Sequence, residues 1–142
     1  MGSSDSGDVF EWPVRVYYED TDAQGVVYYA NYFRFMERAR TEWLRRLGFD
    51  QKKMLNEERR MFVVVSTRAE FVMPAQFNDE LIVTASLGNL TRASFDIVQN
   101  IYRGSRDGEL LLRGGVKAAI LDADTMKPQR VSASFFEGKK YE

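Results

Sequence analysis

The residues best suited to chemistry lie between a predicted strand and a predicted helix. Asp22 is followed three positions later by Gly25, in a stretch (20–25) that is rich in turn-forming residues. Aspartate at the first position and glycine at the fourth are typical of a type I turn, so composition alone favours a structural role for Asp22. The turn leads into a helical pattern, however. The first N–H groups of a helix have no partner within it, and they carry the positive end of its dipole.

A carboxylate beside unpaired N–H donors suits the hydrolysis of an activated carbonyl compound. The donors polarise the C=O group and stabilise the oxyanion, while the carboxylate activates water or attacks the carbonyl carbon itself. A thioester fits a weak base such as aspartate better than an amide does, because a thiolate leaves with little acid assistance. The sequence leaves both mechanisms open.

Histidine and cysteine are both absent from the 142 residues. Their absence excludes Ser-His-Asp and Cys-His catalysis, thiolate zinc clusters and histidine-bound metals within this chain. We therefore expect no metal and no cofactor. A formal net charge of −1, from 20 basic and 21 acidic residues, argues against a nucleic-acid partner.

Length and composition predict one globular domain. We expect residues 1–10 to form a flexible N-terminal tail and residues 11–142 to form a single domain. The N-terminal residues lack the apolar core of a signal peptide, and the apolar run 61–65 is too short to cross a bilayer. These features predict a cytoplasmic protein without a membrane span.

The hydrophobic pattern predicts an α+β fold. Residues 14–19 alternate as a strand does. From about Tyr28 the period changes to that of an amphipathic helix of about five turns, which ends at Gly48 and whose apolar stripe is Tyr32, Phe35, Met36, Ala39, Trp43 and Leu47. Asp50 is expected to cap a short second helix that runs to about Glu58. Four strands follow, near 65–72, 81–87, 95–102 and 110–121, with a bulge expected at 114–115. Short connections favour antiparallel pairing, with the long helix packed on the sheet.

Three other carboxylates are weaker candidates than Asp22. Asp20 lies in the same turn. Glu37 has Thr41 four residues on and arginine neighbours, which favours a solvated or ion-paired side chain. Asp79 precedes a strand and is interpreted as a turn residue.

Two stretches of the sequence carry a specific resemblance to a known family. They are Val14-Arg-Val-Tyr-Tyr-Glu-Asp-Thr-Asp-Ala-Gln-Gly-Val-Val-Tyr-Tyr-Ala-Asn-Tyr32 and Met36-Glu-Arg-Ala-Arg-Thr-Glu-Trp-Leu44. The sequence resembles the hot-dog acyl-CoA thioesterases of the 4-hydroxybenzoyl-CoA thioesterase type. Within that group it is most similar to the bacterial branch associated with the Tol-Pal cell-envelope system. The segment 70–81 also fits, so the likeness extends from Trp12 to Arg130.

The resemblance implies a hot-dog domain over residues 11–142, in which an antiparallel sheet of five to six strands wraps around one long central helix. It implies that Asp22 is the catalytic carboxylate and that the backbone N–H of Tyr29, in the opening turn of the helix, binds the thioester carbonyl. Gly25 is grouped with the substrate-binding residues. Many members carry histidine where this chain has Tyr29, and often glycine where it has Gln24.

The resemblance also implies a homo-oligomer. In such a dimer two sheets join edge to edge, dimers commonly pair into tetramers, and each active site lies at a subunit boundary. Coenzyme A brings phosphates that favour basic and hydroxyl partners, for which Arg92 and Ser94 are the candidates. A location in an exposed loop would explain the polar side chains of these two residues at least as well as a role in CoA binding.

The leading hypothesis is a cytoplasmic acyl-CoA thioesterase that converts acyl-CoA and water into a carboxylic acid and CoA. The alternative is a non-catalytic acyl-CoA binding protein or a cell-envelope interaction protein, which the missing histidine favours. A hot-dog dehydratase ranks last because it would normally be expected to use a histidine. The acyl group, the carrier and the pathway stay open at this point.

Overall fold

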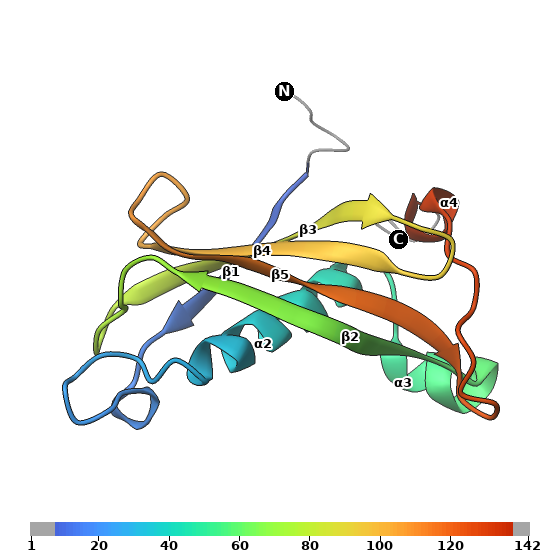
Figure 1. The fold of residues 1–142 in the computed structure, drawn as a ribbon, viewed down its shortest axis with the longest axis horizontal. Coiled ribbons are helices and arrows are strands. Elements are labelled where there is room, and N and C mark those ends of the chain that lie inside the picture. The colour runs from blue at the N-terminus through green and yellow to red at the C-terminus, as the bar shows by residue number, and fades with distance from the viewer. Residues whose placement is uncertain (1–7, 138–142) are drawn as a thin grey trace.

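Five strands form one antiparallel sheet in the order β1-β3-β4-β5-β2 (Figure 1). The strands are β1 (Phe10–Arg15), β2 (Arg60–Phe71), β3 (Glu80–Leu90), β4 (Phe95–Arg103) and β5 (Leu110–Asp122). This computed structural model describes residues 8–137. The predicted α+β class and the predicted antiparallel sheet are confirmed, with five strands in the described part of the chain.

The long helix α2 (Asn31–Arg46) lies along one face of the sheet, where it packs mainly against β3 and β1 (Figure 1). Five residues of its predicted apolar stripe are buried, as the period of 3.6 predicts: Tyr32, Phe35, Met36, Ala39 and Trp43. Leu44 is buried as well, whereas Leu47, the last residue of the predicted stripe, follows the helix and is only partly buried. Gly48, at a φ of 101°, ends the helix, and the N–H of Phe49 then donates to the Leu44 carbonyl at 3.0 Å.

The helix begins three residues later than the periodicity predicts. Residues 28–30 form a turn instead, in which the N–H of Asn31 donates to the Tyr28 carbonyl at 2.8 Å. Tyr29 therefore precedes α2 and does not belong to its first turn.

The first strand also lies elsewhere than expected. β1 covers Phe10–Arg15, and Tyr18–Asp20 forms a 3-10 turn (η1) where the alternation predicted strand. The carboxylate of Asp20 accepts the N–H of Tyr17 at 2.9 Å, which stabilises this turn locally. Phe10, the last residue of the expected tail, pairs with Ala85 in the sheet, while residues 1–7 of that tail lie outside the described residues.

Two short helical segments follow α2. Asp50 caps α3 (Gln51–Lys53) by accepting the N–H of Lys53 at 3.0 Å, as predicted, and the chain continues into η2 (Met54–Glu58). A fourth helix, α4 (Ala133–Glu137), was not predicted. Its Phe136 ring stacks against Trp43 and lies edge-on to Phe49, which closes the core at that end. Within residues 8–137 no helix has the length and apolar character needed to cross a membrane.

The predicted bulge at 114–115 is wrong. Gly114 pairs in register with Ala69 and Gln99, and a Cβ on it would lie 2.5 Å from the Arg68 carbonyl oxygen. Close approach of neighbouring strands therefore explains this glycine. The register shift in the β2–β5 pairing falls between Val64 and Ser66.

Candidate active site

Asp22 lies at the start of a tight hairpin between η1 and α2. Its N–H donates to the Val26 carbonyl at 2.9 Å, and the N–H of Gly25 donates to the Asp22 carbonyl at 3.0 Å. Gly25 has a φ of 82°, a conformation that favours glycine. The predicted turn is therefore present, with Gly25 required by its backbone conformation.

The carboxylate of Asp22 is exposed and only partly used by the turn. Its Oδ1 accepts the N–H of Gln24 at 2.9 Å, whereas Oδ2 has no hydrogen-bond partner among residues 8–137. One carboxylate oxygen thus fixes the side chain to its own hairpin. The other is left available to a substrate or to water.

Tyr29 presents an unpaired backbone N–H at the N-terminal end of α2. No acceptor in the described part of the chain receives this N–H, whereas the N–H groups of Asn31 and Tyr32 donate back to the carbonyls of Tyr28 and Tyr29 at 2.8 and 3.2 Å. The donor therefore lies at the positive end of the dipole of a 16-residue helix. Such an N–H is suited to binding a carbonyl oxygen on which negative charge develops.

Asp22 and Tyr29 are held in one unit by bonds across the hairpin. Thr21 and Val27 form a bridge, and the N–H of Tyr28 donates to the Asp20 carbonyl at 3.0 Å. The side-chain amide of Asn31 donates to the same carbonyl at 3.0 Å, which ties the hairpin to the first residue of α2. The segments that carry the carboxylate and the N–H donor are therefore linked by backbone hydrogen bonds.

The connection from β2 to β3 supports this hairpin from outside. The Ala75 carbonyl accepts the N–H of Val27 at 2.8 Å, and Val26 forms a bridge with Gln76. On its other side Ala75 donates its N–H to the hydroxyl of Tyr32 at 3.0 Å. Burial raises the pKa of the Tyr32 phenol, an effect that the Ala75 N–H partly opposes.

Arg103 anchors the same connection to the sheet. Its guanidinium pairs with the carboxylate of Asp79, donates to the Pro74 carbonyl at 3.1 Å and contacts Glu109 at 3.0 Å. Asp79 also accepts the N–H of Gln76 at 2.8 Å, which agrees with its predicted turn role. The sequence did not predict that Tyr32 and Arg103 support the site, because each bonds to a residue far away along the chain.

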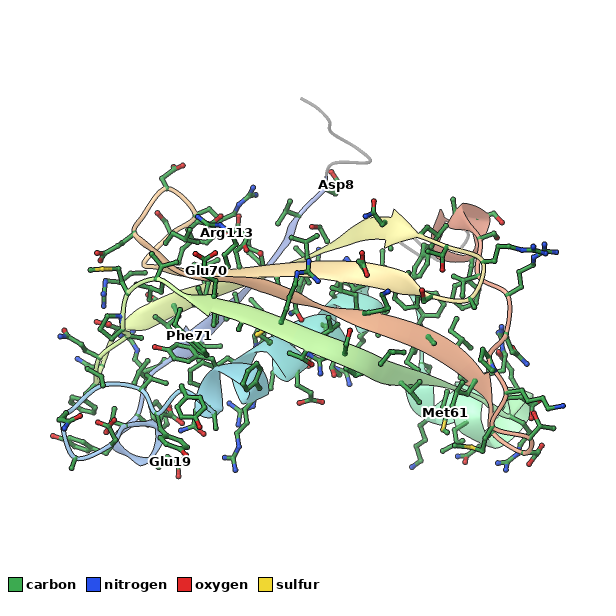
Figure 2. All side chains as sticks on the ribbon, in the orientation of Figure 1. Asp8, Glu19, Met61, Glu70, Phe71 and Arg113 are labelled. Carbon is green, nitrogen blue, oxygen red and sulfur yellow. The ribbon has the colours of Figure 1, made fainter. Side chains whose placement is uncertain are left out.

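A hollow of about 210 Å³ lies beside Tyr29. It is lined by Val27, Tyr29, Tyr32, Phe71, Val72, Met73 and Pro74. The Phe71 ring lies edge-on to the Tyr29 ring, with 6.1 Å between the ring centroids, and its centroid is 5.6 Å from that of the Tyr32 ring. Figure 2 shows Phe71 at the end of β2 nearest to the loop that carries Glu19, with Met61 at the other end.

Asp20 and Glu37, like Asp79, have structural partners. The carboxylate of Asp20 is engaged by the N–H of Tyr17, and that of Glu37 accepts the hydroxyl of Thr41 at 3.3 Å, as the helical spacing predicted. Among residues 8–137 no three His, Cys, Asp or Glu side chains are grouped so that they could hold a metal ion.

Arg92 and Ser94 lie far from Asp22 within one chain. They belong to the turn between β3 and β4, where the Ser94 hydroxyl is 2.8 Å from that of Thr91 and the Arg92 carbonyl accepts the N–H of Val131 at 2.9 Å. The Asp22 hairpin meets the sheet at Gln76, before β3 begins, so the 11 residues of β3 separate the two places by roughly 30 Å. Figure 1 shows these two loops at opposite ends of the sheet.

Comparison with known proteins agrees with this architecture. The family model of the Thioesterase-like superfamily matches residues 16–137. The acyl-CoA thioesterase YbgC of Haemophilus influenzae is 41% identical over 130 residues, which cover 89% of this chain and 93% of the relative. A probable thioesterase from Bartonella henselae superposes with a TM-score of 0.79 at 33% identity, covering 88% of this chain and 100% of that one.

A 4-hydroxybenzoyl CoA thioesterase superposes with a TM-score of 0.83 over 93% of this chain and 99% of that one. At 22% identity this likeness shows the fold. The chain belongs to the Thioesterase-like superfamily. It is a thioesterase-family protein of hot-dog fold, and the predicted thioesterase family and hot-dog fold are confirmed.

Proposed function

We propose that this chain hydrolyses acyl-CoA thioesters to a free carboxylic acid and CoA. The observation that carries the proposal is the unpaired N–H of Tyr29 at the N-terminal end of α2. It lies in the same hairpin as the carboxylate of Asp22, of which only Oδ1 is hydrogen-bonded. The name of the Haemophilus influenzae relative, an acyl-CoA thioesterase, supports the choice of substrate.

In this mechanism the thioester oxygen accepts the N–H of Tyr29, which stabilises the oxyanion that forms on attack. The carboxylate of Asp22 takes a proton from an attacking water molecule, or attacks the carbonyl carbon to give an anhydride that water then hydrolyses. In either case the C–S bond breaks and CoA leaves as a thiolate that gains a proton. When water attacks the acyl carbon, its oxygen ends in the carboxylic acid. Gly25 keeps the backbone of the hairpin in the required turn and lies next to the bound ester.

We further propose that two copies pair through β2. β2 is the outermost strand, 12 residues long, and Val65 on it is 59% exposed, whereas the opposite edge strand β1 has six residues and contains Pro13. A long apolar edge is prone to pairing, and proline protects the other edge. An antiparallel β2–β2 contact brings the Phe71 end of one copy beside the Met61 end of the other, so each Asp22 lies near the subunit boundary.

Arg92 and Ser94 could reach the site of Asp22 only from another copy of the chain. Within one chain they lie at the far end of β3 from Asp22. There they would bind the phosphates of CoA, as Arg and Ser side chains do well. A tetramer and an association with the Tol-Pal system belong to the same proposal and rest on the sequence resemblance. A cytoplasmic location is proposed as well and rests on the absence of cysteine, which suits the cytosol.

A direct thiol-release assay tests the function. The purified chain is given a panel of short aliphatic, long aliphatic and aromatic CoA esters, and free CoA is measured with a thiol reagent. We expect release from at least one class at a rate well above that of the uncatalysed ester. Tight binding of the esters without any thiol release would instead support the alternative, a non-catalytic acyl-CoA binding protein.

A further inference from the structure

Gln99 is a fully buried polar side chain on β4, the middle strand of the sheet. Apart from aromatic residues, the described part of the chain buries only two polar side chains, Gln99 and Thr84. An amide in an apolar core loses its hydration, and hydrogen bonds within the protein have to replace it. The partners of Gln99 therefore indicate what this residue holds in place.

The amide of Gln99 joins the long helix α2 to the sheet. Its Nε2 donates to the Met36 carbonyl of α2 at 2.9 Å and, at 3.4 Å, to the Thr84 carbonyl of β3. Its Oε1 accepts from Nη1 of Arg40, also on α2, at 3.4 Å. Within residues 8–137 no other residue of a strand is hydrogen-bonded to α2. Most of the remaining contact between α2 and the sheet is apolar packing, which is not directional.

The surroundings permit only one orientation of this amide. Arg40 presents donors that only the amide oxygen can accept, whereas Met36 and Thr84 present carbonyls that only the NH₂ group can satisfy. A reversed amide would place its oxygen against two carbonyl oxygens and its NH₂ group against a guanidinium. The donor end of Gln99 is therefore fixed toward the backbone of α2.

The attachment coincides with a gap in the backbone pairing of the sheet. The paired residues of β3 and β4 skip positions 84–85 and 99–100. There the N–H of Asn100 donates to the Thr84 hydroxyl at 2.9 Å, and the Thr84 carbonyl accepts from the Gln99 side chain. Side-chain hydrogen bonds thus replace backbone pairing at the place where α2 is attached to the sheet.

The attached segment of α2 is close to the end that carries the proposed oxyanion donor. Met36 lies roughly 8 Å along the axis from Asn31, the first residue of α2, and Tyr29 precedes Asn31 by two positions. A helix is stiff over this length, so a rotation or a shift of α2 on the sheet displaces the Tyr29 N–H as well. The hairpin that carries Asp22 is bonded to the β2–β3 connection, so such a shift changes the position of the donor relative to the carboxylate.

We propose that Gln99 is a positioning residue for the thioesterase reaction. By holding α2 at one rotation and one height on the sheet, it places the Tyr29 N–H where the thioester oxygen binds. The inference rests on the proposed thioesterase function. It adds to that function a residue of the sheet that acts through α2 and contacts neither the substrate nor the reacting atoms.

Gln99→Met tests this role, because methionine has a similar length but forms none of the amide hydrogen bonds. Release of CoA is measured from butyryl-, palmitoyl- and benzoyl-CoA, and the ester that the unmodified chain cleaves fastest is used for every variant. We expect kcat to fall about 10- to 100-fold and KM to change by less than about threefold, since a displacement near 1 Å can cost about 10²-fold in rate.

Thr84→Val is the matched control for a loss of stability. It removes a buried hydroxyl from the same gap but leaves the bond from Gln99 to Met36 in place. Both variants should melt at a lower temperature than the unmodified chain. Only Gln99→Met should lose kcat when each is assayed well below its melting temperature. If Gln99→Met does not fold, Gln99→Asn replaces it: its amide is one methylene too short to reach Met36, and the same loss of kcat is expected.

A double variant separates positioning from a general weakening of the structure. In Tyr29→Pro the donor is already absent, so adding Gln99→Met should lower kcat by no more than about threefold further. Two independent effects would instead multiply. This comparison distinguishes an action through the Tyr29 N–H from a role in stability alone.

The two proposals fail in different ways. Release of CoA with an unchanged kcat in Gln99→Met overturns the positioning role and leaves the thioesterase function standing. Equal losses of kcat in Gln99→Met and Thr84→Val, or losses that multiply fully in the double variant, overturn the positioning role as well. Absence of thiol release from every ester by the unmodified chain overturns both proposals.

Discussion

The hydroxyl of Tyr32 accepts the backbone N–H of Ala75 at 3.0 Å, across 43 positions of sequence. This single bond joins the first turn of α2 to the connection between β2 and β3. Because the Ala75 carbonyl in turn accepts the N–H of Val27, the helix, the connection and the Asp22 hairpin form one supported unit. The position of the candidate catalytic groups therefore depends on a contact outside the hairpin itself.

Replacing Asp22 by asparagine should abolish most of the activity. The amide keeps an oxygen that can accept the Gln24 N–H, so the hairpin should persist, but it is neither a base nor a nucleophile. We expect kcat to fall by about 10²- to 10⁴-fold, with an unchanged circular dichroism spectrum and melting temperature. Undiminished hydrolysis by a folded, pure variant would refute the assignment of Asp22.

Replacing Tyr29 by proline should remove the donor and keep a backbone suited to the start of a helix. The loss of one oxyanion donor is expected to lower kcat by about 10²- to 10³-fold. The control is Tyr29→Phe, which retains both the N–H and the ring and should stay within a few fold of the unmodified chain. Equal activity of the proline and phenylalanine variants would rule out the backbone donor.

Removing the hydroxyl of Tyr32 should destabilise the protein. In Tyr32→Phe the buried N–H of Ala75 loses its acceptor, which costs about 1–3 kcal/mol in the free energy of unfolding. Urea denaturation measures this difference. Tyr18→Phe, at an exposed ring, should change stability by no more than a few tenths of a kcal/mol. Equal losses in both variants would argue against a special role for the Tyr32–Ala75 bond.

We expect the buried phenol of Tyr32 to make the protein less stable at alkaline pH. Burial raises the pKa of Tyr32 above its ordinary value of 10.0, so the folded state keeps this proton longer than the unfolded state does. Its contribution to stability is complete below pH 10 and is lost as the pH rises through the raised pKa. The stability difference between the unmodified chain and Tyr32→Phe should therefore be constant from pH 7 to 9 and shrink above 10. A difference that grows above pH 10 would contradict the direction of the shift.

A charge on the outer edge of the sheet should weaken self-association. Val65 lies at the register shift of β2 and is exposed, so Val65→Lys places a positive charge on both sides of a two-fold β2 contact. We expect analytical ultracentrifugation to show a shift toward monomer, together with lower thioesterase activity at low protein concentration. Ser105→Lys, in the exposed loop between β4 and β5, should change neither quantity.

Much of the local structure followed from the sequence because it depends on neighbours. The Asp22 turn, the buried stripe of α2, the Gly48 termination and the Asp50 cap each involve residues within a few positions of one another. The beginning of α2 and the limits of β1 were misplaced by a few residues. In both places a local turn, at 28–30 and at Tyr18–Asp20, interrupts an apolar pattern that would otherwise continue.

The surroundings of the candidate site were decided by the tertiary structure. Phe71 reaches Tyr29 because β2 pairs with β5 in a register that ends at Phe71 and Leu112, and Arg103 reaches Pro74 because β4 ends beside the β2–β3 connection. The sheet also places Arg92 and Ser94 one strand length away from Asp22. The amino-acid sequence by itself determined which groups are chemically competent and which local turns present them. Strand register, which depends on contacts between distant residues, determined which side chains surround them.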